Sequence, residues 1–247
     1  NEGIRSILEH AKPGMMEYEL EAYFKFECIK RGEKKLAFSP IVASGKNATI
    51  LHYEKNNSKI EKNDLVLLDV GAKYQEYNAD ISRTFPASGK FNKRQKEVYN
   101  EVLQIQKKII NSVKPGITIK ELQTKTIELI TEALFRLKLI TKKSKVSPPP
   151  SPDISGAATD DSEEYKKYYM HGVSHHLGLD THDLSDREEK LQVGNVITVE
   201  PGIYIKEEKI GVRIEDDVLV TKNGCEVLSS KIPKEIEEIE RITAKRE

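Results

Sequence analysis

The chain has 247 residues, enough for one large domain or two small ones with a substantial core. Its 40 Lys and Arg residues balance 40 Asp and Glu residues, and this zero net charge argues against nucleic acid as a main partner. No apolar run approaches the ~20 residues that span a bilayer, so no membrane partner is expected. Two cysteines without a CxxC spacing exclude a disulfide framework and favour a reducing compartment, the cytoplasm.

The N-terminal half is predicted to place helices before strands. Apolar residues at helical spacing predict helices over residues 2–12 and 16–31. Short apolar and β-branched runs predict strands from Ile41 and from Asp64, and another over residues 76–85. Because the helical spacing starts at once and the chain does not begin with methionine, we expect further sequence upstream.

Two long helices are predicted next. Residues 93–113 carry apolar side chains on one helical face. Thr118 and Glu121 form a capping box that starts a helix over residues 119–140. The proline-rich residues 142–162 cannot cover a core face, so a mobile surface loop without catalytic groups is predicted there.

The C-terminal part returns to strands. A histidine-rich segment, HGVSHHLGLDTHD, precedes predicted strands over residues 195–205 and 211–221. Asn223 and Gly224 predict a hairpin turn, and a last helix is expected over residues 234–243. Helices therefore precede strands in both parts of the chain.

A weak internal repeat suggests that the two parts are related. LLDVG, with Asp69, resembles TVEPG, with Glu200, because each has an acid two residues before a glycine. A second acid follows on the next predicted strand, at Asp80 and at Glu215. The spacing between counterparts is nearly equal, which favours duplication over coincidence in a strand-rich chain. The predicted halves are residues 1–115 and 116–247.

These four acids are predicted to lie close together. A tight turn near Tyr74 would set Asp69 opposite Asp80, and a turn in the KEEK stretch would set Glu200 opposite Glu215. Acids on solvated strand faces are the ordinary alternative, but apolar runs around Asp69 and Glu200 are typical of buried strands. Four buried carboxylates repel one another unless protons or cations neutralise them, and two divalent ions would do so.

Histidines strengthen the interpretation as a metal site. A lone histidine is usually structural, and His10 is expected at the surface, but a cluster that coincides with four acids favours one imidazole ligand. His175 and His176 face opposite ways in an extended segment, so they should not bind the same ion. The other histidines could position substrate or move protons, and spacing alone does not choose among them. The remaining candidates are His52, His171 and His182.

The chemistry that these residue types favour is hydrolysis. The sequence has no glycine-rich phosphate loop and no Gly-x-Ser-x-Gly motif, and Cys28 lacks local support as a nucleophile. Oxygen ligands with one imidazole suit manganese, iron(II), cobalt or zinc. Two such ions with a bridging water form a hydrolytic site.

The sequence resembles the dinuclear metallopeptidases with the pita-bread fold in the order and surroundings of five residues: Asp69, Asp80, His175, Glu200 and Glu215. HGVSHHLGLDTHD, VEPGIYI and GVRIEDDVLVT are more similar to aminopeptidase P and prolidase than to methionine aminopeptidase. The resemblance covers nearly the whole chain and fills all five ligand positions. It implies an α+β fold with two pseudo-symmetric halves, in which helices cover a curved, mostly antiparallel sheet.

The resemblance also implies the metal ligands. Asp80 and Glu215 would bridge two divalent ions, with manganese expected first and zinc, cobalt or iron as alternatives. Asp69 would complete one ion, and His175 with Glu200 would complete the other. A hydroxide between the ions would attack the peptide bond, and the N-terminal residue would be released where proline follows.

Further roles are implied for residues around the ions. His52 and His182 would lie near the scissile carbonyl and His171 beside the proline pocket, while Glu200 would shuttle the proton. Arg213 would connect to Asp69, with Tyr204 as a further member of that network. For the histidines and for Tyr204, ordinary core packing is the alternative, and for Arg213 a simple ion pair.

The implied activity is an Xaa-Pro aminopeptidase acting on peptides with proline in second position. Prolidase, which cleaves Xaa-Pro dipeptides, is the close alternative, and a non-catalytic peptide-binding module of the same fold is a third. Aminopeptidase P and prolidase carry a separate N-terminal domain to which nothing here corresponds. That domain helps to form oligomers, so a homo-oligomer is expected only for a full-length protein.

Overall fold

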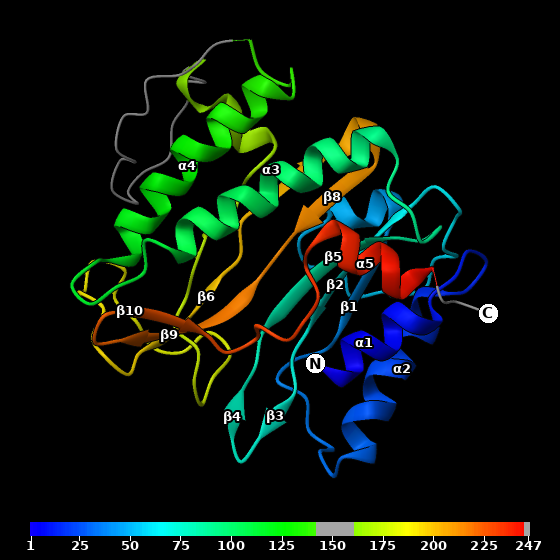
Figure 1. Cartoon of the computed structure of the whole chain (residues 1–247), viewed down its shortest axis with the longest axis horizontal. Coiled ribbons are helices and arrows are strands. Elements are labelled where there is room, and N and C mark those ends of the chain that lie inside the picture. The colour runs from blue at the N-terminus through cyan, green and yellow to red at the C-terminus, as the bar shows by residue number, and fades with distance from the viewer. Residues whose placement is uncertain (142–160, 245–247) are drawn as a thin grey trace.

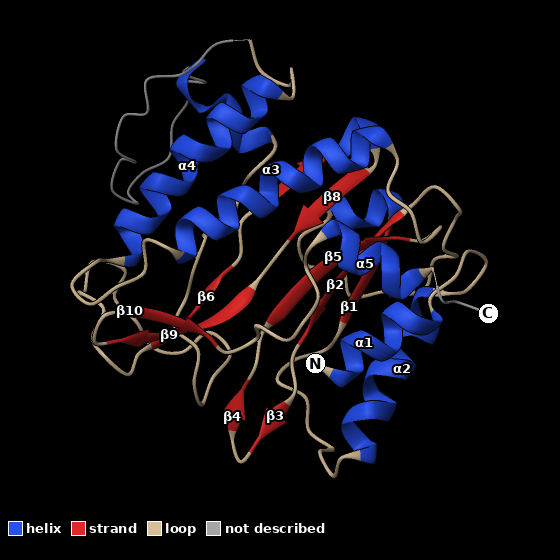
Figure 2. Ribbon diagram, viewed as in Figure 1, coloured by secondary structure: helices blue, strands red, loops and turns tan. Residues whose placement is uncertain are grey.

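The computed structural model describes residues 1–141 and 161–244, in which helices cover antiparallel strands (Figures 1 and 2). α1 (Glu2–His10) and α2 (Glu17–Lys30) pack against each other and confirm the two predicted N-terminal helices. The predicted loop over residues 142–162 lies almost entirely outside the described residues, and the description resumes with η2 (Asp161–Lys167). No helix in the described part is both long and apolar enough to cross a bilayer.

The first sheet has the strand order β1-β2-β5. Both β2 and β5 are buried along almost their whole length. The apolar sequence of β2, LVLLDV, predicts this burial, whereas β5, ISRTFP, buries polar side chains as well. A short hairpin joins these two strands and projects from the end of the sheet (Figure 1). The elements are β1 (Ile41–Ser44), η1 (Gly45–Thr49), β2 (Leu65–Val70), β3 (Lys73–Tyr74), β4 (Tyr77–Asn78) and β5 (Ile81–Pro86).

The predicted pairing of Asp69 with Asp80 is wrong. Asp69 pairs with Ser82, because the hairpin turns at Gln75 and Glu76 rather than one residue earlier. These two residues have φ angles of 47° and 69°, the left-handed values that a two-residue hairpin turn requires. Asp80 is consequently the diagonal neighbour of Asp69 on the same face of the sheet.

The C-terminal strands form a second sheet with the order β10-β9-β6, and β7 pairs with β8. Each long predicted strand is interrupted once, at Glu200 and at Glu215, but the pairing continues in one register on both sides of the interruption. Glu200 therefore lies opposite Glu215, as predicted. The strands are β6 (Val196–Val199), β7 (Gly202–Ile205), β8 (Ile210–Arg213), β9 (Asp216–Thr221) and β10 (Gly224–Val227).

Three further helices complete the fold. α3 (Lys93–Ile110) crosses β6, β7 and β8, and α4 (Ile119–Arg136) packs on α3 (Figure 1). α4 ends earlier than its predicted boundary at residue 140, because Lys138 adopts a left-handed φ of 60°. The last helix, α5 (Ile236–Thr243), packs against α1.

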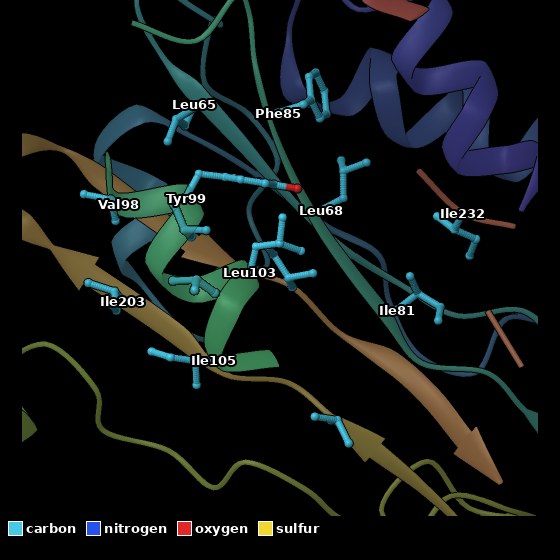
Figure 3. Close-up of a cluster of buried hydrophobic side chains, with 14 of the residues drawn as sticks. Leu65, Leu68, Ile81, Phe85, Val98, Tyr99, Leu103, Ile105, Ile203 and Ile232 are labelled. Carbon is cyan, nitrogen blue, oxygen red and sulfur yellow. The ribbon is translucent and has the colours of Figure 1, made fainter. Parts of the chain in front are cut away.

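The main core lies between α3 and the strands of the first sheet. Tyr99 and Leu103 of α3 reach toward Leu68 and Phe85, which belong to β2 and β5 (Figure 3). Leu68, Phe85 and Tyr99 have no measurable exposure. Because this apolar layer leaves little freedom to β2 and β5, it fixes the strands that carry the first two acids.

The capping box at the start of α4 provides a direct test of local stability. Thr118 accepts a hydrogen bond from the Glu121 backbone, and the Glu121 side chain accepts one from the Thr118 backbone. Thr118→Ala is expected to lower the free energy of unfolding by about 1 kcal/mol, measured by urea denaturation. Thr124→Ala, within the same helix and away from the cap, is the control and should change it by less than about 0.5 kcal/mol. Equal effects of the two substitutions would contradict the capping argument.

Candidate metal centre

All nine predicted site residues line one cavity of 560 Å³. It lies where the ends of β2, β5, β7 and β8 meet the histidine-rich segment. A larger hollow of 860 Å³ among α1, α2 and α5 contains none of the nine, so size alone would select the wrong cavity. The residues that the structure brings together are His52, Asp69, Asp80, His171, His175, His182, Glu200, Arg213 and Glu215.

Two glycines of the repeated motifs have a steric role. A Cβ atom on Gly71 would lie 1.9 Å from the Ala79 carbonyl oxygen, and one on Gly202 would lie 2.6 Å from the Tyr204 hydroxyl. Position 71 therefore requires glycine, because neighbouring backbone occupies the space of a side chain, and a side chain at position 202 would displace the Tyr204 ring. This explains why each acid is followed by glycine two residues later.

Three ligand types converge at the centre of the cavity. Asp80, His175 and Glu215 each offer a ligand atom, and these atoms all lie within 4.8 Å of one another. The His175 Nε2 atom is 3.5 Å from an oxygen of Asp80 and 3.5 Å from an oxygen of Glu200. The His175 Nδ1 atom is 3.0 Å from the His176 carbonyl oxygen, and donation there leaves the Nε2 lone pair directed at the acids.

Burial of several acids together strongly perturbs their protonation. Burial and the neighbouring charge of Asp69 raise the pKa of Asp80 to about 10. Burial raises the pKa of Glu215 well above its usual range, and the charge of Asp80 adds to this shift. Burial also raises the pKa of Glu200 to about 7, although His175 acts in the opposite direction. The protein therefore holds these carboxyl groups where their own charges are unfavourable.

The donor set fits divalent cations. The Asp69 Oδ1 atom is buried and has no hydrogen-bond partner among the described residues. An unsatisfied buried carboxylate oxygen beside other acids costs free energy that a cation would recover. Carboxylate oxygens with one imidazole match the preferences of manganese, iron, cobalt and zinc.

A hydrogen-bonded chain connects the acids to His171. The Arg213 guanidinium donates to Asp69 Oδ2 at 2.5 Å and to the Tyr204 hydroxyl at 3.3 Å. The Tyr204 oxygen is 2.9 Å from His171 Nε2, and His171 Nδ1 is 2.8 Å from the Gly172 carbonyl oxygen. Burial, reinforced by the charge of Arg213, lowers the pKa of His171 to about 3. His171 is therefore a neutral imidazole, and the predicted contact of Arg213 with Asp69 and Tyr204 is confirmed.

The other histidines divide between the metal-site cavity and a separate hollow. His52 and His182 are exposed on the cavity, and the rings of His182 and His175 meet edge to face with centroids 4.5 Å apart. His176 instead lines a separate hollow, as its alternation with His175 predicts. Burial and the charges of His175 and His52 lower the pKa of His182, so the cavity histidines lie within electrostatic reach of one another.

Sequence reasoning missed Ser82, which connects two of the predicted residues. Its hydroxyl accepts from Arg213 Nε at 2.7 Å and donates to Glu215 Oε2 at 2.7 Å. Thr84, two residues further along β5, exchanges hydrogen bonds with the Arg213 backbone. The alternation of polar side chains at Asp80, Ser82 and Thr84 is a pattern from which a polar strand face could have been predicted.

A second missed group supports the backbone of Glu215. Arg83 and Asp216 form a fully buried ion pair at 2.7 Å, and Arg83 also donates to the Glu215 carbonyl oxygen. Burial acts to raise the pKa of Asp216, but Arg83 and Lys234 outweigh it and lower this pKa to about 2. The group joins β5 to β9, and no local pattern in the sequence distinguishes it from surface charges.

Comparison with known proteins gives concordant matches. A family profile described as Metallopeptidase family M24 matches residues 1–222. The chain is 38% identical over 247 residues to a Xaa-Pro aminopeptidase from Haemophilus influenzae, which covers 95% of this chain and 55% of that protein. The chain thus spans about half the length of this relative.

Solved structures match the fold closely. A protein assigned as an aminopeptidase P from Bacillus anthracis superposes with a TM-score of 0.89 and 48% identity, over 99% of this chain and 54% of that one. Zinc-substituted aminopeptidase P from Escherichia coli, in complex with product, superposes with a TM-score of 0.88 and 34% identity, over 99% of this chain and 56% of that one. The predicted fold is confirmed, and the chain belongs to metallopeptidase family M24.

Proposed function

We propose that this chain is the catalytic part of a metal-dependent aminopeptidase that releases the N-terminal residue from peptides with proline in second position. The observation that carries the proposal is the convergence of one imidazole and four acids, from distant parts of the sequence, on one cavity. The relative from Haemophilus influenzae carries the name Xaa-Pro aminopeptidase, which supports the same substrate class.

Two divalent ions would be held by the five predicted ligands, with manganese as the first candidate and zinc, cobalt and iron as alternatives. When bound, such ions supply an activated water and polarise a carbonyl group. The assignment of individual ligands is part of the proposal: Asp69, Asp80, His175, Glu200 and Glu215.

The remaining groups of the cavity are proposed to bind the peptide and move its proton. Glu200, whose carboxylate lies 3.5 Å from His175 Nε2 at the edge of the donor set, is proposed to accept and return the proton. Neutral His171, held by Tyr204 and the Gly172 carbonyl, offers a fixed ring face beside the proline position. His52 and His182 can donate hydrogen bonds to the peptide carbonyl as it gains charge.

Two alternatives make different demands on the same cavity. A prolidase requires a free carboxylate directly after proline, whereas an aminopeptidase accepts a longer chain at that point. A peptide-binding module of this fold would need no metal ligands, and the complete donor set disfavours it.

The experiment that tests the proposal compares an Xaa-Pro-Xaa tripeptide with the Xaa-Pro dipeptide. Protein treated with a chelator should be inactive, and added Mn²⁺ should restore hydrolysis with a higher kcat/KM for the tripeptide. Preference for the dipeptide would identify a prolidase. Tight peptide binding without cleavage at full metal loading would instead favour the binding module.

Other aspects of the whole protein are also proposals. We propose two related halves, residues 1–115 and 116–247, because each contributes two acids from adjacent strands. A homo-oligomer and a cytoplasmic location are proposed for the complete protein. The location rests on the two free cysteines, which suit a reducing compartment.

A further inference from the structure

Glu17, the first residue of α2, is a fully buried acid outside the metal-site cavity. Its Oε1 atom accepts hydrogen bonds from the Ser44 backbone at 2.7 Å, the Ser44 hydroxyl at 2.8 Å and the Asn47 amide at 3.0 Å. Its Oε2 atom accepts from the Tyr53 hydroxyl at 2.8 Å and the Ser58 backbone at 2.9 Å. Five donors satisfy this carboxylate without any ion pair in the described residues.

All five donors belong to one segment, residues 44–58, and they flank His52 on both sides. Ser44 and Asn47 precede His52, whereas Tyr53 is its immediate neighbour and Ser58 follows. The His52 side chain is exposed on the cavity, and within residues 1–141 and 161–244 it forms no hydrogen bond or ion pair. The position of His52 therefore depends on the backbone of its segment.

The segment is also tied to the strands that carry the site. The Tyr53 ring is buried in a small apolar cluster with Leu67 of β2 and Tyr204 of β7. Tyr204 is the residue that bonds His171 and Arg213. The hydrogen bond from Tyr53 to Glu17 thus holds in place a residue that is next to His52 in the sequence and that packs against the strands of the metal site.

We propose that Glu17 is a positioning residue for His52: it holds residues 44–58 so that the imidazole meets the peptide, and it touches neither peptide nor metal. This inference rests on the proposed function, because it assumes that His52 acts on the substrate. A carboxylate is required, since both of its oxygens receive donors. An amide in either orientation would turn an NH₂ group toward the backbone N–H of Ser44 or of Ser58.

The test is a double-mutant cycle between Glu17→Gln and His52→Ala, measured as kcat/KM for an Xaa-Pro-Xaa tripeptide at full Mn²⁺ loading. Glu17→Gln alone should lower kcat/KM about 10- to 100-fold, the cost of a misplaced group near the reacting atoms. In the His52→Ala background, Glu17→Gln should lower kcat/KM by less than about 2-fold, because the imidazole that Glu17 positions is already absent. Metal content should not change.

Matched variants separate positioning from general damage. Glu19→Gln makes the same chemical change in the same turn of α2, where the Glu19 side chain accepts a hydrogen bond from the Met16 backbone, and should leave kcat/KM unchanged. Tyr53→Phe removes one of the five bonds to Glu17, together with the longer contacts of the same hydroxyl with Asn57 and Ser58 at 3.3 Å. It should reproduce a smaller, His52-dependent loss even where Glu17→Gln folds poorly. Losses that are equal in both His52 backgrounds, or no loss in either variant, would overturn the inference.

A second measurement does not depend on catalysis. Amide hydrogen exchange over residues 44–58 should accelerate in Glu17→Gln and remain unchanged in Glu19→Gln. If the wild-type protein does not hydrolyse the tripeptide, or His52→Ala is fully active, the proposed function fails at that step. Unaltered exchange in Glu17→Gln would instead contradict the positioning role itself.

Discussion

Asp80→Asn is expected to lower kcat/KM for an Xaa-Pro-Xaa tripeptide by at least about 10³-fold, equivalent to roughly 4 kcal/mol of transition-state stabilisation. Asp80 is 5% exposed and meets both His175 and the charge of Asp69 at the centre of the donor set. An amide keeps the volume of the side chain but removes its charge and one of its two acceptor oxygens. The substitution therefore tests ligation with little change in packing.

The control for this prediction is Asp180→Asn. Asp180 is exposed in the same histidine-rich segment and does not line the cavity, so the variant should retain wild-type kcat/KM. Metal content after dialysis should fall in Asp80→Asn and stay constant in Asp180→Asn. A fully active Asp80→Asn protein, or one that retains both ions, would contradict the proposed ligand set.

The acids of the site could be predicted from sequence because their settings are unusual. Asp69 follows four buried apolar residues of β2, and Glu200 follows the buried strand β6. An acid in such a run requires a partner, and repetition of the pattern identified four of them. The pairing of Glu200 with Glu215 also followed from the symmetry of the intervening turn.

The register of the first sheet could not be obtained in the same way. A shift of the turn to Gln75 and Glu76 changed the partner of Asp69 from Asp80 to Ser82. Neither residue at the turn is Gly or Asn, so the sequence lacks the usual marker of left-handed φ angles. The apolar pattern of a strand determines which of its residues face the core, whereas the position of the turn determines which residues of the two strands pair with each other.

Long-range polar contacts were the other feature beyond sequence reasoning. Arg83 and Asp216 are 133 positions apart in the sequence, and their pairing depends on how β5 meets β9. Glu17 likewise bonds residues 27 to 41 positions away. Such partners are set by tertiary packing, which acts on chemically ordinary residues.

The metal-free protein is expected to lose stability as the pH rises from 7 to 9, and divalent ions should remove most of that loss. In the folded state the pKa of Asp80 is about 10 and that of Glu215 is well above its usual range. An unfolded chain releases both protons near pH 4. Above that pH the folded state binds more protons, so its free energy of unfolding falls as pH increases, by about 1.4 kcal/mol per pH unit for each retained proton.

Thermal melts of chelated protein at pH 7, 8 and 9, with and without Mn²⁺, measure this effect. For a chain of this size 1 kcal/mol corresponds to roughly 2–4 °C in Tm. Mn²⁺ should raise Tm more at pH 9 than at pH 7, because ions bind the deprotonated acids and compete less with protons as pH rises.

Asp80→Asn tests how much of this pH dependence comes from Asp80 and its effect on Glu215. Without metal, the variant should melt at a higher temperature than the wild type at pH 9, and its Tm should decline less between pH 7 and 9. The substitution also removes the charge of Asp80 that helps to raise the pKa of Glu215, so the difference between the slopes reports Asp80 together with its coupling to Glu215. If Tm falls equally with pH in both proteins and Mn²⁺ does not raise it, the buried acids do not destabilise the metal-free fold. Divergent slopes would show that the fold sacrifices stability at this cavity for the ability to bind cations.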